Sequence, residues 1–392
     1  MSTLPYLPYI PLEVAENIID QLGEDVRSLR SCALTCRGWN RHARYHLVAS
    51  ILVQSREDLY SIYDYFASKP RMTSFVRSLS MSPGPGDKKT GCLLEVLPVD
   101  LLKLLPNLRR YCIVGVYGRT LYRIAFHDTT FIRIKTYLHV EELHLQALRF
   151  RTGAELARVL IALPRLRRLH CRGLIADNLT ADTSRFRDKC NMLSEVTSHT
   201  DDIVNLIIQM SLSTLRILRC NLKALTGRVD LSELKHLHSV DITTYDLIDH
   251  SFDQMISVIA TVPSKKLRSL TISFLNARTW PTSSEYVRHP LDDAILALDT
   301  SVVVSMAQQK PNRRAFWSKI VQRYLPRLHE AKLLQVQCSS GAYNMCTSSL
   351  KASALTSLFH RIPRWRVAPG PRDQGDSHGR LPGRSILCHR SG

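Results

Sequence analysis

The side chains that could carry out chemistry do not form a catalytic motif in this sequence. Neither His-Glu-x-x-His, the pattern of zinc proteases, nor Gly-x-Ser-x-Gly, the pattern of serine hydrolases, occurs, and the 15 histidines are dispersed. The glycine-rich segment 84–91 contains Lys89 and Thr90 but no glycine directly before them, and Pro85 removes a backbone N–H that a phosphate-binding loop would donate. We therefore expect a protein that is not an enzyme and uses no cofactor.

The cysteines and the N-terminus indicate an intracellular protein without a metal site. The ten cysteines include no Cys-x-x-Cys pair, and no neighbouring histidine or second cysteine pair completes four zinc ligands around Cys32 and Cys36. Reduced, mostly buried thiols are expected. The N-terminus lacks the features of a signal peptide, and no window reaches the ~18 apolar residues of a membrane span. We expect a cytoplasmic or nuclear protein with no membrane contact.

The chain is strongly basic, but its charge is unevenly distributed. Its net charge is +19 and its pI is about 9.7. Residues 1–50 are neutral, whereas residues 361–392 carry +5 and residues 51–360 carry +14. Such an excess favours an acidic partner. The segment 361–392 is rich in Arg, Pro and Gly without apolar periodicity, and we expect it to be a disordered basic tail.

Residues 5–50 are predicted to form a module of three short helices. Pro11 suits a first helical turn, Gly23 favours the end of that helix, and Asp25 can cap the next one. Apolar residues recur at helical spacing along all three segments: Val14, Ile18, Leu22, Leu29, Ala33, Trp39, Ala43 and Leu47. Three helices of this length bury little by themselves, so we expect the module to pack on the body or to keep a partner surface.

Residues 10–39 combine an Ile-Pro-Leu-Glu-Val start, an apolar stripe and a Cys-Arg-Gly-Trp end. In this combination the segment resembles an F-box, with Ile10 where the family usually has Leu and Thr35 where Val is common. The resemblance implies that the helices bind the Skp-type adaptor of a cullin ubiquitin ligase through an apolar surface. The residues assigned to adaptor binding are Ile10, Pro11, Val14, Ile18, Leu22, Leu34 and Trp39. A small capping subdomain is the alternative.

The middle of the chain repeats an apolar-x-x-apolar-x-apolar pattern. It begins at Val76, Leu108, Val140, Leu166, Leu215, Leu237 and Leu267, with a degenerate copy at Leu193 and a weak one at Leu328. Up to Leu267 the copies lie 22 to 32 residues apart, close to the ~20–29 of a leucine-rich repeat. The last gap is 61 residues, so we expect an insertion or a lost unit at about 276–325.

Helix starts lie between these predicted strands. Ser55 precedes one apolar stripe, and Thr152 with Glu155 and Ser251 with Gln254 form the capping pairs of two others. Each helix–strand unit leaves an apolar face that only a stacked neighbour can cover. The sequence therefore predicts an α/β fold, in which the three-helix F-box-like module precedes an irregular leucine-rich-repeat α/β solenoid over residues 51–345.

Taken together, residues 5–340 resemble the F-box and leucine-rich-repeat class of substrate receptors. The resemblance implies a non-catalytic substrate-recognition subunit of a cullin-type E3 ubiquitin ligase, whose repeats bind a target protein. Two alternatives remain open, a nucleic-acid-associated basic repeat protein and a non-ligase interaction scaffold. Nucleic acid is the less favoured partner, because only 7% of the residues are aromatic and no basic stripe interleaves with them.

The polar face of the predicted strands is the expected target-binding surface. The two residues that flank the central apolar position of each strand lie on one face of the sheet. In the first half of the repeats this face carries the basic residues Arg110, Arg168, His170 and Arg219. We expect them to bind an acidic or phosphorylated target segment, because guanidinium groups pair with phosphate. A solvated basic face without a ligand is the alternative.

Overall fold

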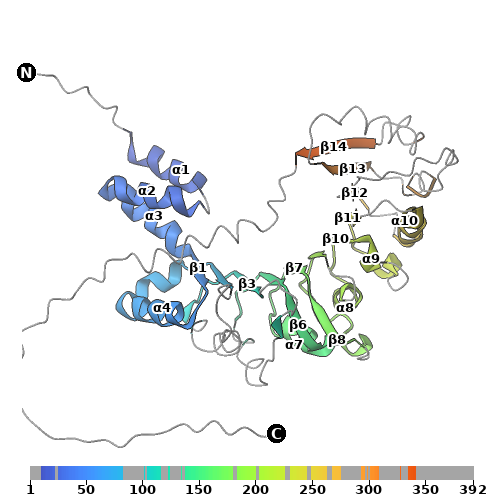
Figure 1. The fold of residues 1–392 in the computed structure, drawn as a ribbon, viewed down its shortest axis with the longest axis horizontal. Coiled ribbons are helices and arrows are strands. Elements are labelled where there is room, and N and C mark those ends of the chain that lie inside the picture. The colour runs from blue at the N-terminus through green and yellow to red at the C-terminus, as the bar shows by residue number, and fades with distance from the viewer. Residues whose placement is uncertain are drawn as a thin grey trace, which may run out of the picture.

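A long parallel sheet follows three N-terminal helices in the computed structural model of the chain (Figure 1). The structure describes residues 10–340 with gaps, the longest at 83–100, 124–133, 275–292 and 309–326; residues 1–9 and 341–392 are outside the described part. The fold is mixed α/β with an N-terminal helical region, as predicted. The predicted tail 361–392 lies outside the described residues.

The N-terminal helices are α1 (Leu12–Leu22), α2 (Val26–Thr35) and α3 (Arg37–Ala49). Asp25 caps α2 as predicted, since its carboxylate accepts hydrogen bonds from the backbone N–H groups of Arg27 and Ser28. We call these three helices the helical trio. Its fully buried side chains among the described residues are Ala15, Ile19, Leu29 and Ala43, of which Ile19, Leu29 and Ala43 form one cluster, a small core for three helices.

The helical trio continues directly into the sheet. Helix α3 ends at Ala49 and strand β1 starts at the next residue. Tyr45 on α3 packs edge-to-face on Phe75 with ring centres 5.1 Å apart, and its hydroxyl accepts a hydrogen bond of 3.0 Å from Arg77. These contacts fasten the end of α3 to the short 3₁₀ helix η1 (Pro70–Phe75).

The main sheet has eleven strands among the described residues, and every neighbouring pair is parallel. In spatial order they are β1 (Ser50–Val53), β2 (Ser78–Met81), β3 (Arg110–Val114), β5 (Glu142–Gln146), β7 (Arg168–Arg172), β9 (Glu195–Ser198), β10 (Ile217–Asn221), β11 (Ser239–Thr244), β12 (Ser269–Phe274), β13 (Ser301–Gln308) and β14 (Leu334–Ser340). The spatial order follows the chain, so each strand pairs with the next one along the sequence that belongs to this sheet.

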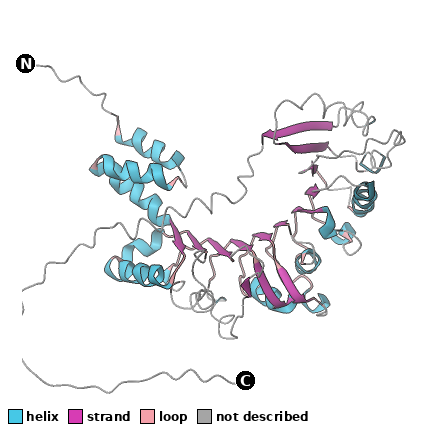
Figure 2. Ribbon diagram, in the orientation of Figure 1, coloured by secondary structure: helices cyan, strands magenta, loops and turns pink. Residues whose placement is uncertain are grey.

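The row of strands curves, and helices lie on its outer side (Figure 2). These helices are α4 (Arg56–Ser68), α7 (Gly153–Ile161), α8 (Val204–Met210), α9 (Leu222–Leu225) and α10 (Asp249–Thr261). A second sheet, also parallel, is formed by β4 (Tyr122–Arg123), β6 (Leu148–Thr152) and β8 (Ile175–Asn178). Two further 3₁₀ helices are η3 (Thr183–Phe186) and η4 (Leu231–Glu233).

The predicted central residues of the repeated pattern form the core side of the main sheet. They pair in register from each strand to the next, and each is at most 3% exposed: Leu79, Tyr111, Leu143, Leu169, Val196, Leu218, Val240 and Leu270. Burial of one such side chain contributes roughly 1.5–3 kcal/mol, so this row is a main source of stability. The strand positions predicted from the pattern are confirmed for these eight copies.

The end of the sheet contains a strand that the repeated pattern did not mark. Strand β13 lies inside the range 276–325 that was expected to be an insertion or a lost unit. Val302 of β13 pairs with Leu270 of β12 and with Leu334 of β14, so one strand of the main sheet lies within that range. The run Val302-Val303-Val304 was the available signal, because β-branched residues favour strands. The weak copy starting at Leu328 lies outside the described residues, and β14 starts at Leu334.

Two of the three predicted helix starts are confirmed. Ser55 caps α4 in a reciprocal capping box with Asp58, and the Thr152 hydroxyl accepts from the backbone N–H of Glu155 at the start of α7. The third start was wrong by three residues: a cap at Ser251 predicts a helix from residue 252, whereas α10 begins at Asp249 and includes Ser251.

The cysteines among the described residues are all free, and four of the six are buried, namely Cys112, Cys171, Cys190 and Cys220. Burial raises the pKa of the Cys190 thiol to about 12 and raises the pKa values of Cys171 and Cys220 further. These three thiols are therefore protonated at neutral pH. The prediction of reduced, mostly buried thiols is confirmed for the described cysteines. None of the described helices has the length and apolar character needed to cross a membrane.

Candidate partner-binding surfaces

The helical trio exposes a row of large apolar side chains. Ile10, Val14 and Ile18 are 45%, 47% and 43% exposed, and Leu34 at the end of α2 is 87% exposed. The buried face of α1 is formed instead by Ala15 and Ile19, one residue further along the helix in each case. Helix α1 is thus apolar on two sides, and only one of them is covered by the other helices.

The seven residues predicted to bind the adaptor divide into two groups. Ile10, Pro11, Val14, Ile18 and Leu34 are exposed, whereas Leu22 and Trp39 are half-buried and pack against the core of the helical trio. We call the exposed group, together with Leu12, the apolar strip. Leu12 is 43% exposed and was not among the predicted residues, although its position beside Pro11 was a signal for it.

A close helix contact brings the two parts of the apolar strip to the same end of the helical trio. A Cβ atom placed on Gly38 would lie 3.1 Å from Cδ1 of Leu12, so glycine allows α1 to approach the start of α3. Leu34 precedes Gly38 by four residues. The first turn of α1 therefore packs beside the start of α3, which follows the end of α2 in the chain.

The predicted target-binding residues lie on the polar face of the sheet, where Glu142 joins two of them. Arg110, Glu142 and Arg168 are register partners on β3, β5 and β7. Nε of Arg110 is 3.2 Å from Oε1 of Glu142, and Nη2 of Arg168 is 2.8 Å from Oε2. The structure brings these two arginines together around the carboxylate of Glu142. No role was predicted for Glu142 from the sequence.

Two histidines complete this carboxylate cluster. The rings of His144 and His170 stack with centres 4.3 Å apart, and Nε2 of His144 lies 2.5 Å from Oε1 of Glu142. Burial opposes ionisation of Glu142, but the hydrogen bond with His144 and the charge of Arg110 outweigh it and lower the pKa of Glu142 to about 2. Burial, and then the neighbouring His144, lower the pKa of His170 to about 4. His170 is therefore neutral at pH 7 and adds no positive charge to this face.

The fourth predicted residue, Arg219, is also paired. Its guanidinium group forms an ion pair with Glu195 on the neighbouring strand β9. Between His170 and Arg219 in the register lies Thr197, which is 7% exposed and was missed by the sequence analysis. The Thr197 hydroxyl has no hydrogen-bond partner within the described part of the chain. A buried hydroxyl of this kind is a group that a ligand on the polar face can satisfy.

Comparison with known proteins does not assign this chain to a family. Neither a protein-family model nor a curated protein sequence matches it. The geometry offers two surfaces for a partner, the apolar strip of the helical trio and the polar face of the sheet. They have different chemistry: within the described part of the chain the first is uncharged and exposed, while the second consists of internally paired charges and hydrogen-bonding groups.

Proposed function

We propose that this chain is the substrate-recognition subunit of a cullin-type E3 ubiquitin ligase, in which the helical trio binds a Skp-type adaptor. The apolar strip supports this role, because Ile10, Val14, Ile18 and Leu34 occupy the positions that the F-box resemblance assigns to the adaptor and are exposed on a module with a small core. Exposed apolar residues grouped in this way are typical of protein interfaces. The chain would contribute position and no catalytic group.

We further propose that the parallel sheet is an irregular leucine-rich-repeat solenoid. Each strand from β2 to β12 that belongs to the main sheet carries the repeated apolar pattern and pairs with its neighbour in sequence. Among the described residues, the helices that follow β1 lie on the outer side of the curved row of strands (Figure 2). The polar face of the strands is therefore our proposed site for the target protein.

The pairing of charges bears on what target the polar face would bind. Arg110 and Arg168 already share Glu142, and Arg219 is paired with Glu195. An acidic or phosphorylated target segment must compete with these carboxylates for the arginines. It therefore gains less binding free energy than three unpaired arginines would provide. The hydroxyl of Thr197 adds a hydrogen-bonding group at the centre of the same surface.

Binding of the full chain to a purified Skp-type adaptor, measured by titration, tests the first part of the proposal. Ile18→Glu and Leu34→Glu each place a charge in the apolar strip, at side chains whose exposure makes a folding defect small. Hot-spot residues contribute about 2 kcal/mol or more, so each change is expected to weaken adaptor binding by roughly thirtyfold or more.

Tyr60→Glu is the matched control, because Tyr60 is a large exposed side chain, 64% exposed, on α4 outside the helical trio. It should leave adaptor affinity unchanged. Thermal unfolding of all variants separates lost binding from lost folding. Failure of the wild-type chain to bind the adaptor overturns the proposed function, and equal binding by the Ile18 and Leu34 variants overturns the assigned surface.

A further inference from the structure

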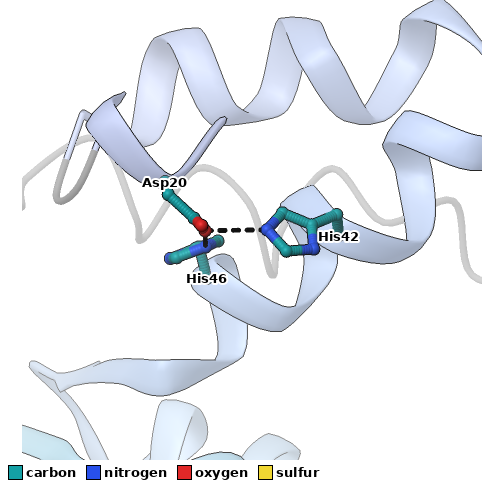
Figure 3. A group of neighbouring side chains, drawn as sticks. All are labelled: Asp20, His42 and His46. Carbon is teal, nitrogen blue, oxygen red and sulfur yellow. Dashed lines mark hydrogen bonds and ion pairs between the residues drawn. The ribbon is translucent and has the colours of Figure 1, made fainter. Parts of the chain in front are cut away.

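Asp20, His42 and His46 bring one carboxylate and two imidazoles together between α1 and α3 (Figure 3). Nε2 of His42 and Nε2 of His46 each lie 2.7 Å from the same oxygen, Oδ1 of Asp20. We propose that these three side chains bind a zinc ion that links α1 to α3. This site departs from the expectation of no metal, which rested on the dispersed histidines and on the lack of further ligands around Cys32 and Cys36.

The positions of the three residues follow from local structure and helix packing. His42 and His46 are four residues apart on α3, so their side chains project from the same face of the helix, one turn apart. Asp20 comes from the last turn of α1, which packs beside α3. Asp20 lies 22 and 26 residues before the two histidines, and this spacing does not predict that the three side chains are in contact.

The donor set suits zinc in number and kind. Zinc binds imidazole nitrogen at about 2.0–2.1 Å and carboxylate oxygen at about 2.0–2.2 Å, and three protein ligands with one water form a tetrahedral site. Two ligands of a tetrahedral zinc ion are about 3.3 Å apart at these bond lengths. The donors lie within 4.8 Å of one another, so small side-chain rotations suffice to admit an ion. The three side chains are 20–49% exposed, which leaves room for the water.

The charges around the cluster also favour a cation. Oε1 of Glu16, one turn before Asp20 on α1, lies 3.7 Å from Nδ1 of His42, on the opposite side of the ring from Asp20. A carboxylate in that place adds negative charge to the site, and a small side-chain shift would let it accept a hydrogen bond from Nδ1 of a zinc-bound His42. By contrast, Glu142, His144 and His170 also lie close together, but two arginines already neutralise Glu142, and these would repel a cation.

A zinc ion at this place would stabilise the helical trio. Among its described residues, four side chains are fully buried, namely Ala15, Ile19, Leu29 and Ala43, and two of these are alanines. Modules with small cores often depend on a metal for stability. The ion would hold α1 against α3 and so fix the direction of the apolar strip on α1. This role does not depend on the identity of the partner that binds the strip.

Zinc titration of the chelator-treated full chain, against a chromophoric zinc chelator, tests the proposal. Asp20→Asn keeps the size of the side chain and one acceptor oxygen, and His42→Gln with His46→Gln removes both imidazoles. Loss of a group that only orients a ligand costs 10–100-fold in affinity, so loss of a ligand is expected to weaken binding by about a hundredfold or more. Zinc should raise the unfolding temperature of the wild type and leave that of these variants unchanged.

Two control variants assign the site. Cys32→Ser with Cys36→Ser removes the nearby thiols, and His144→Gln with His170→Gln removes the other histidine cluster; both should bind as much zinc as the wild type. Circular dichroism without metal confirms that each variant is folded, and cobalt substitution reports nitrogen and oxygen ligands by weak visible bands without thiolate charge transfer. Equal zinc affinity in the Asp20 and histidine variants, or loss of binding only in the cysteine variant, overturns the proposal.

Discussion

Replacement of Glu142 by Gln perturbs the most connected ion pair of the polar face. The carboxylate is 7% exposed and contacts the side chains of Arg110, Arg168 and His144 at 3.2, 2.8 and 2.5 Å. Glutamine fills the same volume but carries no charge, and its amide nitrogen turns a donor toward one of the guanidinium groups. The variant therefore removes the attraction with little change in packing.

The size of the effect follows from the pKa of Glu142. It falls from the ordinary 4.5 to about 2 in the folded chain, which corresponds to roughly 3 kcal/mol of stability at neutral pH. The loss on substitution should be smaller, because the side chains of Arg110 and Arg168 are 41% and 48% exposed and regain water. We expect Glu142→Gln to lower the free energy of unfolding by about 2 kcal/mol.

Urea unfolding at several pH values measures this prediction. A carboxyl group whose pKa is lowered by folding stabilises the protein above its unfolded pKa of 4.5, and this stabilisation is lost as the pH falls toward 2. The difference between wild type and Glu142→Gln should therefore be full at pH 6–7 and shrink below about pH 4.5. Glu233→Gln, which removes an exposed ion pair with Arg187, is the control and should change stability by at most ~0.5 kcal/mol.

A Glu142→Gln variant as stable as the wild type at pH 7 would refute the reasoning, because the arginines would then gain nothing from the carboxylate. A difference that stays constant down to pH 3 would also refute it. That result would show that shape or hydrogen bonding, and not the charge of Glu142, accounts for the loss.

Three further substitutions test the core, the histidine pair and a helix cap by urea unfolding. Leu143→Ala leaves a cavity at a fully buried position and should cost about 3 kcal/mol, whereas Leu138→Ala, at a side chain that is 52% exposed, should cost at most ~0.5 kcal/mol. The pKa of His170 is lowered from 6.5 to about 4, so the unfolded chain binds the proton more readily and the free energy of unfolding falls as the pH drops from 6.5 to 4. His170→Gln should reduce this pH-dependent fall. A pH profile identical to that of the wild type contradicts this prediction. Ser55→Ala removes the acceptor for the Asp58 N–H and should cost about 1 kcal/mol, an expectation that fails if stability is unchanged.

Local patterns determined most of the framework of this protein. The strand cores from Val76 to Ile272 were predicted because a strand buried on one side must place an apolar residue at every second position. The caps at Asp25 and Ser55 were predicted because a short polar side chain satisfies backbone N–H groups within three residues of itself. Both signals depend only on neighbours in the sequence. Signals of the same kind predicted that the apolar residues Val14, Ile18 and Leu34 lie on helices.

Only the tertiary structure decided what these residues face. Helical periodicity cannot tell which apolar side of α1 is covered, and it is the packing of α2 and α3 that buries Ile19 and leaves Ile18 exposed. Strand pairing decided that Glu142 stands between Arg110 and Arg168, so a face that the sequence describes as basic is largely paired. In the same way, Asp20 meets His42 and His46 only because α1 packs on α3. Charge pairing, burial and ligand geometry depend on contacts between residues that are far apart in the sequence. A local sequence pattern cannot predict such contacts.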